Sequence, residues 1–400
     1  MTTRKEPERL MDDVSALAEI PNRGPATEGE ARAALYVSRR MTDLGLDPQV
    51  APFRVVPHFP MAWALHALFL AATCLIAVTS PFAAFVAQAL IFISFWGDST
   101  TRFYWIRSLL PSATSRHVIG RLAAKGVAKK TVVFAAHIDS GQMGMIMEPV
   151  QAERVCRFHK RVLGTQPLML SLVVAAFLTA PVAVLHYRVM GPGGASTYIL
   201  LAAIVANLIP VVIFSQLEFA KISPGANDNG SGVAVMLEMA RRLRAKPAEN
   251  TEVVFVGVGS EETYMMGMAC FMEEHGHRFD RNHTYFLVPE SCGNGTPRVI
   301  VAEGVVSMHH HDPELAGLVF LAARRRGIKA DPVTLRTGGT DCTPPSVRGY
   351  AATGIICMNE NDYVPNYHWN TDLPRDVKPD VMTRVADIFE ETVRIIDKDL

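Results

Sequence analysis

Four long stretches without a charged side chain constrain this chain more than any other feature of its sequence. They cover residues 61–79, 82–96, 167–185 and 196–217. A helix needs about 20 mainly apolar residues, within a usual range of about 17 to 25, to cross a bilayer. Three stretches reach that range, whereas 82–96 is shorter and fits either a full or a partial crossing. Buried core helices are the alternative, but they seldom run so long without a polar face. We therefore predict membrane-spanning helices and a lipid bilayer as a partner.

The four stretches form two pairs, and this pairing predicts two transmembrane hairpins, over residues 59–98 and 166–218. The remaining residues, 1–58, 99–165 and 219–400, contain charged residues at an ordinary frequency. We predict that these three segments fold together as one domain, which contains the candidate catalytic residues. If these pieces fold together, each hairpin must return the chain to the side of the bilayer from which it left.

The distribution of basic residues predicts which side of the membrane holds the domain. The far side of the hairpins offers only Arg188. Nine basic residues lie near the hairpin bases on the domain side: Arg54, Arg102, Arg107, Arg116, Arg154, Arg157, Lys160, Arg161 and Lys221. Cytoplasmic loops carry an excess of Lys and Arg. We therefore predict a multi-pass integral membrane protein with its domain on the cytoplasmic side.

Charge and cysteine content exclude some classes of protein. The 39 basic and 39 acidic residues cancel, so no overall basic field favours nucleic acid as a partner. The six cysteines show no CxxC spacing, which indicates free thiols in a reducing compartment rather than a disulfide scaffold. The charged N-terminus lacks an apolar segment, so no cleaved signal peptide is expected.

A His-x-Asp pair ends the first predicted buried strand, in TVVFAAHIDS (131–140). Side chains in a strand repeat every two residues, so His137 and Asp139 point to the same side. An imidazole is a good zinc ligand, and a nearby carboxylate can fix its tautomer. Taken alone, such a pair is more often an ordinary surface or core feature.

Three further segments place acidic residues at the ends of predicted elements. Asp228 lies in a Gly- and Asn-rich loop before a helix, where a carboxylate can bridge two cations or simply cap the helix. Glu261 and Glu262 follow a buried strand, and their repulsion is relieved if one binds a metal and the other acts as a general base. An exposed acidic turn is the alternative. Glu290 follows the next strand, from Tyr285 to Val288.

A polar loop near the C-terminal end contributes His368. The candidate residues thus recur at the C-terminal ends of several predicted strands, the edge where open α/β sheets form ligand sites. Two histidines and three carboxylates, with one spare carboxylate, suit two zinc ions bridged by Asp228 and a water.

In this order, the segments resemble the M28 family of metallopeptidases, which contains zinc aminopeptidases, glutamate carboxypeptidase and glutaminyl cyclase. The resemblance covers roughly residues 8–58, 112–141 and 223–398. Its motifs are AAHIDS, GANDNGSGVAVMLEMAR, GSEE, the strand ending at Glu290, and GTDCTPP followed by VPNYHWNTD. Each motif is loose, but five in the correct order are specific. The resemblance implies an α/β fold, with a mixed central sheet flanked by helices. The two hairpins predicted from the apolar stretches are a departure from the family and would be inserted into this fold.

The resemblance also implies the ligands of two zinc ions. His137 and Glu290 would hold the first ion, Glu262 and His368 the second, and Asp228 would bridge both. The family usually has Asp at the position of Glu290. The longer side chain still reaches a metal, but it can shift the metal spacing or the metal preference.

Further roles follow from the same resemblance. Glu261 would be the general base, and Asp139 would orient the first histidine. Three residues would line the substrate end of the pocket: Tyr367, Thr340 and Asp341. The inserted hairpins would hold the mouth of this pocket close to the bilayer.

The leading functional hypothesis is a membrane-bound exopeptidase acting on a peptide substrate, with aminopeptidase action favoured. A related metal amidohydrolase or glutaminyl cyclase is one alternative, and a catalytically silent membrane scaffold or receptor is another. Two other segments remain open to two interpretations. Residues 150–163 fit an interfacial helix or a solvated one, and His309–His311 fit a solvated loop, which we favour, or a substrate or metal contact.

Overall fold

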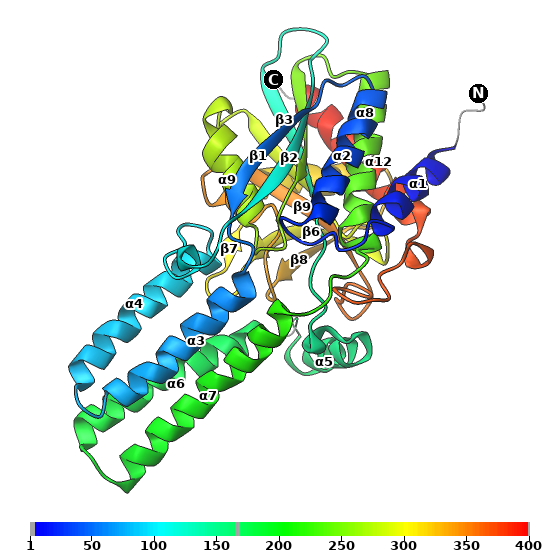
Figure 1. The fold of residues 1–400 in the computed structure, drawn as a ribbon. Coiled ribbons are helices and arrows are strands. Elements are labelled where there is room, and N and C mark those ends of the chain that lie inside the picture. Colours follow the sequence, from blue (N-terminus) through cyan, green and yellow to red (C-terminus); the bar gives the residue numbers. More distant parts are fainter. Residues whose placement is uncertain (1–4, 165, 167–168, 399–400) are drawn as a thin grey trace.

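The computed structural model describes residues 5–164, 166 and 169–398. A nine-stranded mixed sheet forms its centre, in the order β1-β2-β4-β3-β5-β9-β6-β7, with β8 paired to β6 (Figure 1). The strands are β1 (Gln49–Val55), β2 (Ala113–Leu122), β3 (Lys130–His137), β4 (Thr251–Val258), β5 (Thr284–Glu290), β6 (Thr296–Glu303), β7 (His309–His310), β8 (Asp331–Leu335) and β9 (Ala351–Met358).

Four neighbouring strands at the middle of the sheet, β4, β3, β5 and β9, run parallel to one another. Their sequences are rich in β-branched and apolar residues, as expected for strands buried on both faces. Their carboxyl ends therefore meet at one edge of the sheet. The outer strands β1 and β2 pair with their neighbours in the antiparallel sense. Strand β6 pairs antiparallel with β9 and β7 and parallel with β8.

Helices cover both faces of the sheet, and alternating side chains of β3 enter two different cores. Phe134 packs with the first group of helices, whereas Val133 packs with α9 (Met266–His275) on the opposite face. The first group consists of α1 (Glu6–Ala18), α2 (Glu28–Asp43), α8 (Gly232–Ala245), α10 (Pro313–Arg325) and α12 (Pro379–Lys398). The predicted fold class, a mixed α/β sheet flanked by helices, is confirmed.

The domain contains further helical elements. They are α5 (Pro149–Leu163), α11 (Thr343–Ser346), η1 (Arg107–Leu109), η2 (Met145–Met147), η3 (Ala226–Ser231), η4 (Gly276–Arg278) and η5 (Pro374–Asp376).

The four apolar stretches form helices α3 (Phe59–Ile76), α4 (Pro81–Ser99), α6 (Met169–Met190) and α7 (Gly194–Glu218). All four are long and apolar enough to cross a membrane. Figure 1 shows them as a bundle that extends from one end of the domain. The stretch 82–96 is part of a longer helix than its apolar run indicates, because the helix continues through Gly97 to Ser99.

Polar contacts tie the bases of the helices to one another and to the domain. His58 Nδ1 lies 2.6 Å from Glu218 Oε1, which joins the start of α3 to the end of α7. Trp63 Nε1 donates to Asp98 Oδ1 at 2.9 Å, and Arg107 Nε donates to Asp98 Oδ2 at 2.8 Å. Arg107 also donates to the carbonyl oxygen of Thr263, which follows β4 in the domain.

Candidate metal centre

Six side chains from five segments gather at the carboxyl edge of the parallel strands. All six are buried. His137 ends β3 and Glu290 ends β5, while the remaining four come from η3, from the turn after β4 and from the loop between β9 and α12. These four are Asp228, Glu261, Glu262 and His368.

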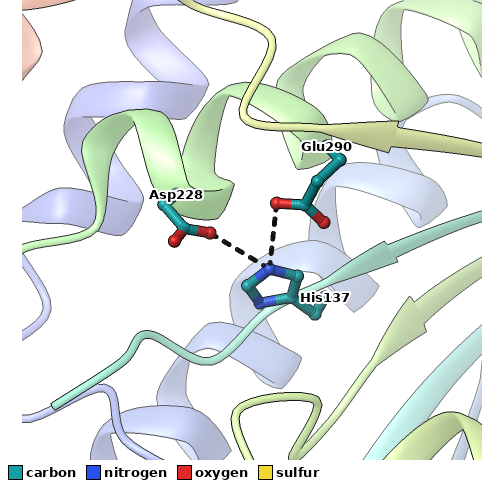
Figure 2. Close-up of side chains that lie close together, drawn as sticks. All are labelled: His137, Asp228 and Glu290. Atoms are coloured by element: carbon teal, nitrogen blue, oxygen red, sulfur yellow. Dashed lines mark ion pairs between the residues drawn. The ribbon is translucent and has the colours of Figure 1, made fainter. Parts of the chain in front are cut away.

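The first group of potential ligands contains His137, Asp228 and Glu290 (Figure 2). His137 Nε2 lies 3.3 Å from Asp228 Oδ1 and 3.6 Å from Glu290 Oε1. Three donor atoms from separate segments therefore converge on one small buried volume.

The second group shares the aspartate and contains Asp228, Glu262 and His368. His368 Nε2 lies 3.3 Å from Asp228 Oδ2 and 3.0 Å from Glu262 Oε2. Asp228 thus directs one carboxylate oxygen toward each histidine, which is the arrangement that a bridging ligand requires. Glu261 joins Glu262 and His137 in a further close group, beside the other two.

The electrostatics of this cluster fit a cation. Burial raises the pKa of Glu290 to about 7 and also raises the pKa of Glu262. Burial alone would lower the pKa of His368, but Glu262 and Asp228 raise it to about 10. Glu262 Oε1 makes no hydrogen bond within the described residues. Buried carboxylates crowded in this way need either protons or a metal, and imidazole and carboxylate donors suit zinc.

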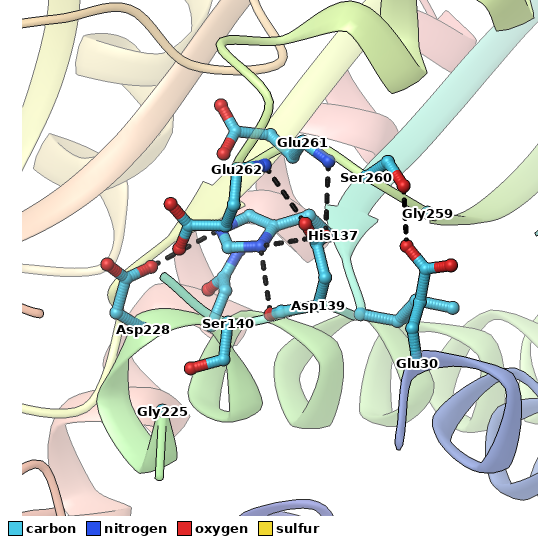
Figure 3. A network of polar contacts seen from close by, with 12 residues as sticks. Glu30, His137, Asp139, Ser140, Gly225, Asp228, Gly259, Ser260, Glu261 and Glu262 are labelled. Atoms are coloured by element: carbon cyan, nitrogen blue, oxygen red, sulfur yellow. Dashed lines mark hydrogen bonds and ion pairs between the residues drawn. The ribbon is translucent and has the colours of Figure 1, made fainter. Parts of the chain in front are cut away.

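Asp139 contacts both His137 and the turn that carries Glu261 and Glu262 (Figure 3). Its carboxylate accepts hydrogen bonds from the backbone N–H groups of Glu261, at 3.1 Å, and Glu262, at 3.0 Å. The same carboxylate lies 3.6 Å from His137 Nδ1, on the side of the ring opposite the ligand groups. Asp139 therefore holds the His137 ring close to the turn that carries Glu261 and Glu262, called the glutamate turn below.

Glu30 of α2 fixes the glutamate turn from another direction. Ser260 Oγ and Ser115 Oγ each donate to its carboxylate at 2.8 Å. Burial raises the pKa of Glu30 to about 8, and the charge of Asp139 acts in the same sense. Ser260 itself has a positive φ of 57°, a backbone conformation that residues other than glycine rarely adopt. The hydrogen bond from Ser260 to Glu30 stabilises this conformation.

Two further buried groups shape the Asp228 loop, and sequence reasoning missed both. The Asp372 carboxylate accepts from the backbone N–H groups of Asn227, at 2.7 Å, and Asp228, at 3.0 Å. Arg23 donates to the carbonyl oxygens of Ile138, at 2.8 Å, and Gly225, at 2.6 Å. The motif VPNYHWNTD ends at Asp372 but gives it no role, and no motif contains Arg23. Each residue acts on backbone atoms far away in the chain.

A cavity of about 190 Å³ opens beside the cluster. Tyr367 lines it, with its ring stacked on His368 at 4.0 Å between centroids. Thr340 also lines it. Asp341 does not; it is fully buried, and burial raises its pKa well above the usual range. The wall beyond the ligand groups is mainly apolar and includes Met147, Ala152, Cys156, Leu335, Ile356, Met358 and Val364.

The interpretation of His309–His311 as a solvated loop is wrong for two of its residues. His309 belongs to β7, which pairs with β6, and its Nε2 lies 2.8 Å from Ser346 Oγ. His311 is buried, with Nε2 3.4 Å from Glu303 Oε1. His310 is exposed. Strand pairing, which the sequence did not reveal, leaves His309 half-buried, and His311 is buried beside Glu303.

Comparisons with known proteins bear on the family and the fold of this chain. Residues 211–393 match the model of peptidase family M28, which confirms the resemblance seen in the sequence. Aminopeptidase YwaD of Bacillus subtilis (strain 168) is 41% identical over 63 residues, which cover 16% of this chain and 14% of that protein. A vacuolar membrane protease of Schizosaccharomyces japonicus is 34% identical over 89 residues, 22% of this chain and 10% of that protein. The chain thus matches well under two thirds of the length of these relatives.

Solved structures show the same fold at low sequence identity. A zinc aminopeptidase from Bacillus subtilis, BSAP, superimposes with a TM-score of 0.57 and 15% identity, covering 97% of this chain and 94% of that chain. A glutaminyl cyclase from an Acidobacteriales bacterium gives a TM-score of 0.55 and 13% identity, covering 100% of this chain and 97% of that chain.

Proposed function

We propose, from the premise that this chain carries a peptidase family M28 domain, that it is a membrane-bound zinc aminopeptidase. The family match and the aminopeptidase relative support a metallopeptidase, and the zinc aminopeptidase fold supports zinc as the metal. The observation that carries the proposal is the Asp228 carboxylate, which faces His137 with one oxygen and His368 with the other.

Two ions would share this site. His137, Asp228 and Glu290 would hold one ion, and Asp228, Glu262 and His368 would hold the other. Zinc, when bound, supplies a Lewis acid for the scissile carbonyl and lowers the pKa of an attacking water toward about 7.

Glu261 is the proton carrier in this proposal. Its carboxylate accepts a proton from the attacking water while the water oxygen bonds to the carbonyl carbon. The same proton then passes to the leaving nitrogen as the C–N bond breaks. The two N–H bonds from the glutamate turn to Asp139 hold Glu261 in place for both transfers.

The cavity walls suit an apolar substrate residue. The lining beyond the ligand groups includes aliphatic and thioether side chains such as Leu335, Ile356 and Met358, so an apolar terminal side chain gains from burial there. Tyr367 and Thr340 supply polar atoms at the cavity lining, where a peptide backbone can be oriented.

The test combines metal analysis with product analysis of the purified full chain in lipid nanodiscs. We expect bound zinc and the release of single residues from peptides with a free amino end. The same peptides with a blocked amino end should remain intact. A protein that binds no zinc and cleaves neither set would be a scaffold rather than an enzyme. Cyclisation of N-terminal glutamine, without release of a residue, would instead support the cyclase alternative suggested by the glutaminyl cyclase fold.

A further inference from the structure

We propose that α5 is an interfacial helix whose outer face binds anionic lipid headgroups, while its inner face forms a wall of the substrate cavity. The contact with lipid stands independently. The consequence for the cavity rests on the proposed function.

The outer face of α5 combines large apolar residues with arginines. Phe158 and Val162 are 61% and 62% exposed. Arg154 and Arg161 are exposed on the same face, since positions four, seven and eight residues apart share one side of a helix. A helix of this composition lies along a membrane surface, with its apolar side chains among the lipids and its cations at the headgroups.

The location of α5 matches the surface of the bilayer. Just before it, the backbone N–H of Met145 donates to Gln216 Oε1 at 3.0 Å, near the domain end of α7. Figure 1 shows α5 beside this end of α7, where the bundle leaves the domain. Only residues 164–168 separate α5 from α6, so the end of one helix lies within about 20 Å of the start of the other.

The charges of α5 favour anionic over neutral lipids. Among the described residues, Arg154 and Arg161 form no ion pair, and Arg157 has only a loose one with Glu153, at 3.8 Å. Glu153, the one carboxylate within α5, is turned toward the domain. The outer face is therefore positive, and clusters of this kind bind anionic headgroups.

The inner face of α5 reaches the site. Ala152 and Cys156 line the cavity. Glu153 Oε1 accepts from Asn359 Nδ2 at 3.1 Å and from Asn361 Nδ2 at 2.8 Å.

The opposite end of α5 adds a second tie to the same loop. Lys160 Nζ lies 3.0 Å from Asp362 Oδ2. The loop then supplies Tyr363 and Val364 to the cavity before it reaches His368. The position of α5 therefore sets the width of the cavity, and lipid that fixes α5 also fixes that wall.

The first experiment tests the lipid contact without using activity. A photo-crosslinking amino acid replaces Phe158 in the full chain, which is then placed in nanodiscs that contain phosphatidylglycerol. The control carries the same group at Val127, which is 78% exposed in the turn between β2 and β3, at the end of the domain away from the bundle (Figure 1). We expect lipid adducts at position 158 and none at 127. A lack of adducts at 158, or equal yields at both positions, would refute an interfacial α5.

The second experiment tests the coupling to the cavity. We expect kcat/KM to rise several-fold when phosphatidylglycerol replaces part of the phosphatidylcholine. The double variant Arg154→Gln/Arg161→Gln should lose this rise, whereas the matched pair Arg32→Gln/Arg39→Gln on α2 should retain it. Lipid adducts without any change in rate would overturn the coupling. A protein that forms adducts yet hydrolyses no peptide would overturn the proposed function instead.

Discussion

At the scale of single residues, the site depends on side chains that follow strand ends. His137, Glu290 and the Glu261–Glu262 pair could be predicted because each lies at, or shortly after, the end of a strand whose apolar sequence is easy to recognise. Asp372 and Arg23 could not, because their partners are backbone atoms more than one hundred residues away. Local sequence carries no sign of such bonds.

Replacing Glu261 with Gln should separate metal binding from turnover. The amide keeps the size of the side chain but cannot accept the proton, so we expect near-normal zinc content and a fall in kcat of about 10²–10⁴-fold. Zinc analysis and peptide hydrolysis on the same sample measure both effects. The control Glu273→Gln changes an exposed glutamate on α9 and should leave both unchanged. Normal turnover in Glu261→Gln would exclude Glu261 as the base.

The raised pKa of Glu30 predicts that the free energy of unfolding decreases as the pH rises. Its pKa is about 8 in the folded protein against 4.5 for the ordinary side chain, so between these values the unfolded chain has released a proton that the folded protein retains. Unfolding is therefore favoured as pH rises through this window, by up to about 1.4 kcal/mol per pH unit. We expect Glu30→Gln to weaken this dependence. Thermal unfolding of both proteins between pH 5 and about 8 measures it, and parallel curves would contradict the assignment.

At the scale of elements, the hairpins were visible as apolar runs, but their attachment to the domain was not. The apolar run 82–96 stops before Gly97, yet α4 continues to Ser99 and buries Asp98. That carboxylate meets Trp63 and Arg107, which come from other elements, so only the assembled structure explains a buried charge at this point.

The Asp98–Arg107 pair predicts a stability test at the junction of hairpin and domain. Arg107→Ala leaves a buried carboxylate without its cation, and we expect a loss of about 3–5 kcal/mol. Replacing both members with apolar residues, as in Asp98→Leu/Arg107→Met, should recover much of it. Arg121→Ala, which breaks an exposed pair with Glu252, should cost less than about 1 kcal/mol. Thermal unfolding in nanodiscs ranks the three variants, and equal losses in Arg107→Ala and Arg121→Ala would contradict a buried junction.

At the scale of the whole molecule, the fold class and its two insertions could be predicted, because the alternation of strands and helices resumes after each apolar pair. The pairing of short strands could not. β7 has only two residues, and its partner β6 turns part of the histidine run inward. The packing of α5 against the cavity likewise depends on contacts between distant segments.

Membrane topology gives a further prediction. The excess of basic residues at the hairpin bases predicts that the domain lies in the cytoplasm, with the connection between α6 and α7 on the opposite side. We expect Gly193→Cys to react with an impermeant thiol reagent in intact cells, and Val127→Cys to react only after the cells are opened. The reverse pattern would invert the orientation.

The interruption of the domain by its hairpins also sets the order in which the ribosome makes the proposed ligands. His137 is made before the second hairpin, whereas every other proposed zinc ligand is made after it. The nascent chain therefore lacks the complete set of proposed ligands until His368 has been synthesised. If the proposed function is correct, the chain cannot hydrolyse peptides before the second hairpin has been synthesised.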